Sequence, residues 1–256
     1  MLVDSHCHLD FPEIADQLDA VFQLMRENQV ERALCVSVTL EDFPRVRRLA
    51  EMYPHIHASV GVHPDYEKVD AVSVEELLAL ADSPRIVAIG ETGLDYFRLT
   101  GDLEWQRERF RTHIRAAREC GKPLIIHTRA AAEDTLRIMR EEGADKAGGV
   151  MHCFTESAEV AKAAMDLGFY ISFSGIVTFK NARDIKAVAT AVPLENILVE
   201  TDSPYLAPVP YRGRTNQPGY VKHVAAEIGR LKGVPFDQVC SITTKNFFNL
   251  FKSIKG

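Results

Sequence analysis

The sequence has few features of disulfide-linked or membrane-spanning proteins. Its five cysteines form no Cys-x-x-Cys pair and are odd in number, which argues against a disulfide framework and a cysteine-based zinc finger. No apolar run approaches the eighteen or so residues that a membrane-spanning helix needs. Met1 leads directly into a strand-like segment, with no basic stretch or signal-peptide core before it. We therefore expect a cytoplasmic protein without a membrane anchor.

Positive charge is also in short supply. The formal net charge is −6 over 256 residues, so the chain lacks the broad basic surface that non-specific binding to duplex nucleic acid requires. A local phosphate site remains compatible with this balance. No glycine-rich phosphate loop follows the first strand-like segment, which disfavours an open doubly wound sheet. The hydrophobic fraction of 46% is that of a globular protein with a large core.

Short β-rich apolar runs alternate with longer amphipathic stretches along the chain. The predicted strands are residues 2–8, 33–38, 56–62, 86–90, 123–127, 149–153, 169–173 and 197–200. The predicted helices are residues 14–26, 43–52, 74–81, 105–120, 132–142, 160–167 and 182–192, with further helical sequence after a loop at 203–219. The strands begin about 20 to 37 residues apart, as in repeated βαβ units. We therefore predict an α/β protein with one domain over residues 1–256, a (β/α)₈ TIM barrel.

Titratable side chains lie at or just after the ends of six predicted strands. His6 and His8 are one residue apart on the first strand, so they point to the same side. The full set is His6, His8, His63, Glu91, His127, His152 and Asp202. Functional groups of such barrels gather at the carboxyl ends of the strands. A cluster of this kind is costly to desolvate unless a metal compensates, so we predict a metal centre.

The number of ligands indicates two ions. Four imidazoles (His6, His8, His127, His152) and two carboxylates (Glu91, Asp202) are too many for one ion with an open coordination position. Two divalent ions about 3.5–4 Å apart, bridged by a carboxylate and by water, fit this set. The ligand types are compatible with Zn²⁺ or Mn²⁺, among other metals, and the carboxylates also with Mg²⁺, so the metal stays open.

Five motifs make the chain resemble the TatD family of metal-dependent deoxyribonucleases. They are VDSHCHLD at 3–10, GETGLDY at 90–96, LIIHTR at 124–129, HCF at 152–154 and LVETDSPYL at 198–206, and the resemblance extends from residue 3 to the region of Asn246. It implies a (β/α)₈ barrel of the amidohydrolase superfamily, a divalent metal centre and hydrolysis of phosphodiester bonds. Many members of that superfamily bridge their metals with a carbamylated lysine on the fourth strand, and here Glu91 stands in that position, as in the TatD pattern.

The resemblance also assigns the ligands. It places His6, His8, Glu91 and Asp202 around one ion, and Glu91, His127 and His152 around the other. We expect a metal-bridged water to attack phosphorus, with Asp202 as the general base. His63 would contact a phosphate oxygen or the leaving group, and a structural histidine at the rim is the alternative. Catalysis would thus depend on Asp202, Glu91 and His63.

Arginine and aromatic residues near these strand ends predict the substrate contacts. Arg129 points to the same side as His127, and the candidates on loops are Tyr96, Tyr205 and Arg212. This combination is typical of sites for single-stranded ends, where bases stack and phosphates meet positive charge. The resemblance to the TatD family implies exonuclease action on DNA ends, so we predict a deoxyribonuclease of the 3′–5′ exonuclease type, with RNA as an alternative substrate and no obligatory protein partner. A hydrolase of another ester or an amide, and a metal-binding scaffold without catalysis, are the competing hypotheses.

Overall fold

The computed structural model describes residues 1–69 and 71–254, and eight parallel strands form its centre. They pair in chain order from β1 to β8 in one sheet. The strands are β1 (Leu2–Cys7), β2 (Val30–Cys35), β3 (Ile56–Val60), β4 (Ile86–Asp95), β5 (Leu124–Arg129), β6 (Gly149–Met151), β7 (Phe169–Phe173) and β8 (Ile197–Val199). Cys7 forms a parallel bridge with Ser203, just after β8, so the barrel is nearly closed. The predicted (β/α)₈ barrel is confirmed.

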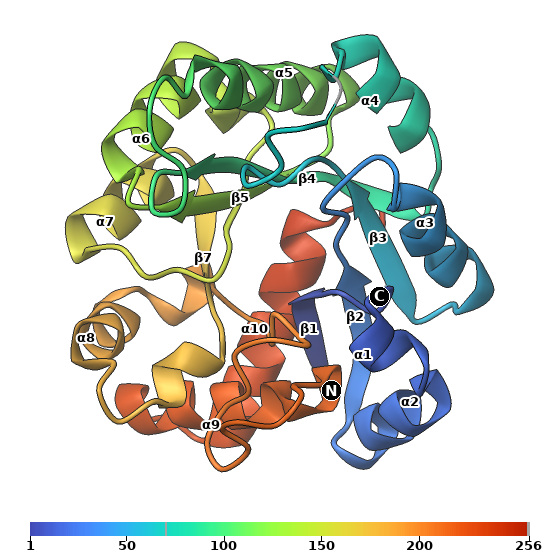
Figure 1. Ribbon diagram of the computed structural model, residues 1–256. Coiled ribbons are helices and arrows are strands. Elements are labelled where there is room, and N and C mark those ends of the chain that lie inside the picture. Colours follow the sequence, from blue (N-terminus) through green and yellow to red (C-terminus); the bar gives the residue numbers. More distant parts are fainter. Residues whose placement is uncertain (70, 255–256) are drawn as a thin grey trace.

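Helices surround the strands in chain order (Figure 1). They are α1 (Pro12–Ala15), α2 (Leu18–Glu27), α3 (Phe43–Met52), α4 (Val74–Ala81), α5 (Glu104–Cys120), α6 (Ala132–Glu141), α7 (Ala158–Asp166), α8 (Arg183–Ala191), α9 (Val221–Lys232) and α10 (Phe236–Leu250). Short 3₁₀ turns, η1 (Ala144–Lys146), η2 (Gly175–Thr178), η3 (Leu194–Asn196) and η4 (Pro218–Tyr220), lie between some of them. In the described part of the chain, no helix has the length and apolar character to cross a bilayer.

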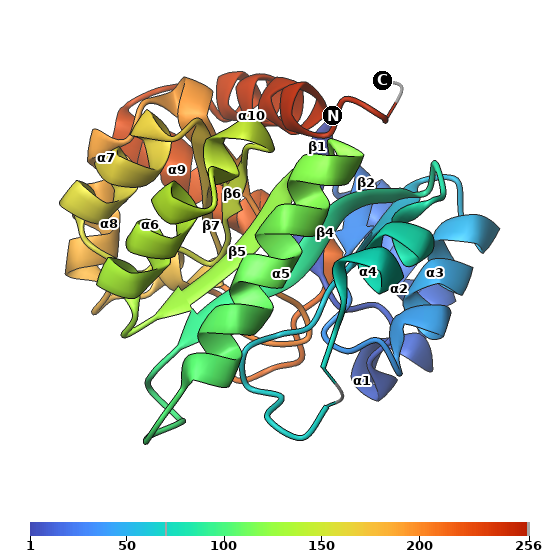
Figure 2. The same ribbon diagram turned by 90° about the horizontal axis from the view of Figure 1, so that it is seen from above.

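Helix α10 covers one end of the barrel. Its Phe247 and the following Phe251 are fully buried and pack against side chains such as Val3, Leu34 and Val150, which belong to the strands. Figure 2 shows α10 across the end of the barrel opposite to α1, which follows the carboxyl end of β1. Burying a phenylalanine side chain contributes on the order of 1.5–3 kcal/mol. Phe247 and Phe251 therefore form an apolar plug at this end, and the carboxyl ends of the strands form the open end of the barrel.

Several elements begin or end a few residues from their predicted bounds, β2 three residues earlier, and two differ more. The helix predicted for residues 14–26 is divided into α1 and α2, because Gln17 leaves the helical conformation with φ −139°. Strand β4 continues five residues beyond its predicted end at Gly90, to Asp95. The backbone of Gly93 has φ +137°, and a Cβ there would overlap the carbonyl oxygen of His127 on β5. Glycine therefore allows the strand to continue past its predicted end in close contact with β5.

Candidate metal centre

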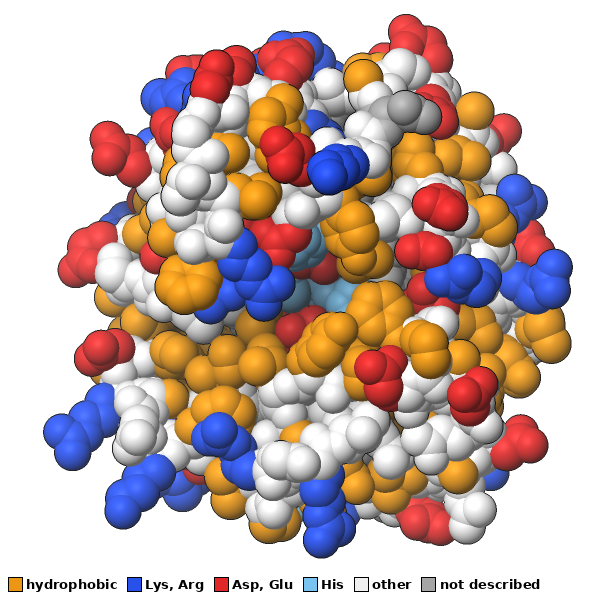
Figure 3. Space-filling model, in the orientation of Figure 1, with side chains coloured by type: hydrophobic (Ala, Val, Ile, Leu, Met, Phe, Trp, Pro, Cys, Tyr) orange, Lys and Arg blue, Asp and Glu red, His pale blue; other side chains and the backbone are white. Residues whose placement is uncertain are grey.

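The predicted ligands meet at the open end of the barrel. Figure 3 looks onto this end and shows pale blue histidine and red acidic side chains at the bottom of a central hollow. The strands position each of these side chains. His6 lies in β1, Glu91 in β4 and His127 in β5. The others stand just after the strands, His8 after β1, His63 after β3, His152 after β6 and Asp202 after β8. All seven lie close enough for contacts between their side chains.

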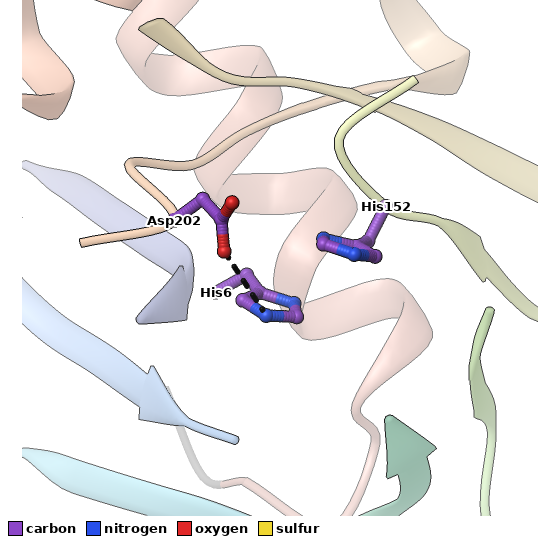
Figure 4. Close-up of side chains that lie close together, drawn as sticks. All are labelled: His6, His152 and Asp202. Atoms are coloured by element: carbon purple, nitrogen blue, oxygen red, sulfur yellow. Dashed lines mark ion pairs between the residues drawn. The ribbon is translucent and has the colours of Figure 1, made fainter. Parts of the chain in front are cut away.

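His6, His8 and Asp202 form one side of the centre. The Nε2 atoms of His6 and His8 are 3.3 Å apart, and Asp202 Oδ1 lies 3.7 Å from the first and 3.4 Å from the second. The ring of His6 also stacks on that of His152, with centroids 3.9 Å apart. Figure 4 shows His6, His152 and Asp202 together. Three separate segments thus bring nitrogen and oxygen donors to one place.

Glu91 joins this side to the other histidines. Its Oε1 lies 2.8 Å from His152 Nε2, 3.2 Å from His127 Nδ1 and 3.4 Å from His63 Nε2. Its Oε2 lies 3.4 Å from His6 Nε2. Burial alone would raise the pKa of this carboxyl group, but the charge of His152 and a hydrogen bond from His127 lower the pKa well below its ordinary value. Glu91 is therefore a carboxylate that faces four imidazoles.

The donor set fits divalent metal ions. The buried His152 Nε2 forms an ion pair with Glu91 Oε1 at 2.8 Å but has no well-aligned hydrogen bond within the described residues, so this nitrogen can serve as a ligand atom. Three groups each offer ligand atoms within 4.8 Å of one another: His6 with His152 and Asp202, His6 with His8 and Glu91, and His63 with Glu91 and His127. Such mixed imidazole and carboxylate sets are typical of Zn²⁺ and of other divalent transition metals.

Two further carboxylates, which sequence reasoning did not single out, hold the ligand rings from behind. Asp95 Oδ2 lies 3.0 Å from His127 Nε2, and Glu200 Oε1 lies 3.2 Å from His152 Nδ1. Each acid thus engages the ring nitrogen that is turned away from Glu91, which fixes the orientation of a metal-binding imidazole. The spacing of Asp95 could have indicated its place at the centre. Asp95 follows Glu91 by four residues on one strand, and side chains repeat every two residues there, so both point to the same side.

Asp4 connects the first strand to the end of the last one. This fully buried carboxylate accepts hydrogen bonds from Thr201 N at 2.8 Å and from Thr201 Oγ1 at 2.5 Å. The backbone N–H of Asp202 in turn donates to the carbonyl oxygen of His6 at 2.9 Å. These bonds fix the position of Asp202 relative to His6.

Comparisons with known proteins identify the family of the chain. The family model described as TatD related DNase matches residues 3–252. The chain belongs to the TatD family. It is 47% identical to the metal-dependent hydrolase YcfH of Escherichia coli K12 (98% of this chain, 95% of that protein) and 44% identical to YabD of Bacillus subtilis 168 (98% and 99%). The crystal structure of YjjV, a TatD homologue from E. coli K12, has a TM-score of 0.91 at 31% identity and covers 98% of each chain.

The chain is therefore a metal-dependent hydrolase of the TatD family. The names of YcfH and YabD specify metal dependence and hydrolysis but no substrate. Membership of the family confirms the hydrolase class that the motifs predicted. The comparisons assign neither the roles of individual ligands nor a substrate.

His63 has a defined protonation state in this TatD hydrolase. Its Nδ1 accepts a hydrogen bond from the backbone N–H of Asp65 at 3.1 Å. Burial lowers the pKa of the imidazole to about 3, so the ring is neutral and carries its proton on Nε2. That N–H points toward Glu91 Oε1, which lies 3.4 Å away. His63 can therefore donate a hydrogen bond at the centre.

The four predicted substrate contacts lie in different surroundings. The guanidinium of Arg129 stacks 3.9 Å above the ring of Phe97. Tyr205 is 53% exposed on the loop after β8. The Tyr96 hydroxyl donates to Asp134 Oδ2 at 2.7 Å and accepts from an arginine of α5, so it is already engaged. Arg212 stacks 3.8 Å above the ring of a phenylalanine that follows η2.

Proposed function

We propose that this TatD hydrolase cleaves phosphodiester bonds at single-stranded DNA ends, as a 3′–5′ exonuclease. The observation that carries the proposal is the convergence of four imidazoles and two carboxylates at the open end of the barrel. The description of its family as TatD related DNase supports DNA as the substrate. RNA offers the same phosphodiester linkage and is the closest alternative.

We assign His6, His8, Glu91 and Asp202 to one divalent ion, and Glu91, His127 and His152 to a second. Bound there, the ions would supply Lewis acidity and neutralise negative charge on the phosphoryl group. Zn²⁺, Mn²⁺ and Mg²⁺ are the candidates.

Asp202 is the proposed general base. Burial would raise the pKa of its carboxyl group, but a hydrogen bond from His8 and the charges of His6 and His152 keep the pKa below its ordinary value. The group is therefore ionised at neutral pH and can take a proton from the attacking water. Its side chain is 16% exposed, so water can reach it.

His63 is the proposed hydrogen-bond donor. Its neutral ring with a proton on Nε2 can donate to a phosphate oxygen or to the departing oxygen of the leaving nucleotide. Glu91 would contribute to both ion sites and also face His63, because its carboxylate lies close to His63, His127 and His152.

The surroundings of the centre favour unpaired nucleotides. Phe97 is 63% exposed and carries Arg129 over its ring, and Tyr205 lies across the centre near Phe11, with ring centroids 6.1 Å apart. The Phe11 ring in turn stacks on the candidate ligand His8 at 4.8 Å. Aromatic surfaces beside positive charge bind single strands by stacking and phosphate contacts.

The test uses end-labelled single-stranded oligonucleotides with Mg²⁺, Mn²⁺ and Zn²⁺ supplied separately to the metal-free protein. We expect stepwise shortening from the 3′ end with at least one metal, and none when the 3′ end is blocked. His6→Ala and Asp202→Asn should abolish turnover with an unchanged circular dichroism spectrum. Intact oligonucleotides with every metal would refute the proposal, and turnover of small esters or lactones instead would identify a different hydrolase.

A further inference from the structure

A second cationic and aromatic site lies on the same end of the barrel as the metal centre. We propose that the cleft between the η2–α8 connection and the loop after β8 binds a phosphate of a nucleotide several positions along the strand from the cleaved bond. This proposal rests on the proposed function and deepens it, because it makes the substrate an oligonucleotide rather than a dinucleotide or a small ester.

Apolar and polar side chains both line the cleft. Ile176 and Ile185 form part of its lining, with Phe179, Lys180, Asn181 and Arg212 around them, and its volume is about 310 Å³. This volume lies at the lower end of the range for small-molecule sites, sufficient for a phosphate with its sugar. The Arg212 guanidinium carbon lies 3.8 Å above the centre of the Phe179 ring. Cation and aromatic surface are therefore already placed together.

Positive charge in the cleft is available to a ligand. Lys180 and Arg212 are exposed, and neither forms an ion pair within residues 1–69 and 71–254. The cleft also adjoins the start of α8, where Ala182 provides no side-chain cap for the first backbone N–H groups. Asp184 lies in the first turn of that helix but does not line the cleft. A phosphate group would find two cations and free N–H donors there.

The walls of the cleft are tied to the metal centre. The backbone N–H of Val209 donates to Thr178 Oγ1 at 2.9 Å, which joins the loop after β8 to η2. A Cβ at Gly175 would overlap the carbonyl oxygen of Leu206, so the two segments touch without space for a side chain. Leu206 follows Asp202 by only four residues. Figure 1 shows α8 and the loop before α9 on the open face of the barrel.

This arrangement favours a strand over a free nucleotide. Residues of η2 and of the loop after β8 line the cleft, and the same loop carries Asp202 of the metal centre. A chain of nucleotides bound at the centre can reach the cleft with a later phosphate. Base stacking and phosphate pairing are each sequence-tolerant, so this second contact would favour long strands without selecting their sequence.

Lys180→Glu and Phe179→Ala test the cleft, and Lys252→Glu is the matched control. Lys252 is an exposed lysine beyond α10, at the opposite end of the barrel. With metal supplied, we compare kcat/KM for a dinucleotide and for a single strand of about twelve nucleotides, a length within the range that one single-strand binding domain covers. The wild-type preference for the longer substrate should fall about tenfold in both cleft variants, through KM, and remain in Lys252→Glu.

A binding assay separates this proposal from the proposed function. Fluorescence anisotropy of the labelled strand in excess chelator should show a Kd about tenfold higher for Lys180→Glu, together with a weaker salt dependence. An equal Kd and an equal length preference in wild type and both cleft variants would overturn the distal site. Loss of mononucleotide inhibition in Lys180→Glu, with length preference retained, would also overturn it by identifying a free-nucleotide site. Absent turnover with an intact binding difference would instead count against the nuclease reaction alone.

Discussion

Glu200→Gln tests whether the carboxylate behind His152 tunes a metal ligand. Glu200 is fully buried, and its Oε1 accepts from the backbone N–H of Cys153 at 2.7 Å and contacts His152 Nδ1 at 3.2 Å. Glutamine keeps the shape and an accepting oxygen, so the ring should keep its orientation. The negative charge disappears, however, and the imidazole becomes a weaker donor to a metal ion. Partners of this kind change metal affinity by about 10–100-fold, or about 1.4–2.7 kcal/mol.

The assay is a competition titration of the chelator-treated protein with Zn²⁺ and a chromophoric chelator. We expect the Kd for Zn²⁺ to rise by about 10–100-fold. The Tm of the metal-free protein should fall only modestly, because one buried amide group costs about 1–3 kcal/mol when it lacks a partner. Glu159→Gln, an exposed change on α7, serves as the control. An unchanged Kd in Glu200→Gln would refute the placement of His152 among the ligands.

Three further predictions concern the barrel itself. Gly93→Ala should destabilise the protein by about 2–4 kcal/mol in urea unfolding, because the new methyl group meets the His127 carbonyl; an unchanged midpoint would contradict this. Phe247→Ala should cost about 3–5 kcal/mol by opening the apolar plug, and a loss below about 1 kcal/mol would show that α10 can repack. Burial lowers the pKa of His57 to about 3, so on acidification the unfolded chain takes up this proton first. Stability should therefore fall from about pH 6.5 toward pH 3, by about 2 kcal/mol at pH 5, and His57→Leu should remove this share of the pH dependence in parallel unfolding curves; parallel losses in both proteins would refute it.

The regular parts of the fold were predictable from the sequence. Alternating apolar runs and amphipathic stretches predict strands and helices, eight such units fit a (β/α)₈ barrel, and the missing glycine-rich loop disfavours an open sheet. The extension of β4 was not, because the predicted strand ended at Gly90, and only the structure shows the close approach of Gly90 and Gly93 to β5. The position of α10 was also not predictable, because the apolar face of this helix could cover an end of the barrel or pack against its outside.

The centre was predictable where residue type alone carries the chemistry. Histidines at strand ends indicate metal binding whatever the details of packing, and the structure brings them together around Glu91. The acids behind the rings were harder to identify, because Asp95 and Glu200 gain meaning only from the ring nitrogens they face. The stacking pair of Arg129 and Phe97 joins the end of β5 to the loop after β4, and no spacing rule predicts it.

The seam between β1 and the segment after β8 determines when the metal centre can form. His6 accepts a backbone hydrogen bond from Asp202, and His8 donates one to Ser203 at 2.8 Å. The same residues thus seal the barrel and supply ligand atoms, so a metal ion shared by His6 and Asp202 would fasten the earliest strand to the latest. During synthesis the metal centre can form only after both β1 and the segment after β8 have been made. Metal binding would therefore report that the fold is complete.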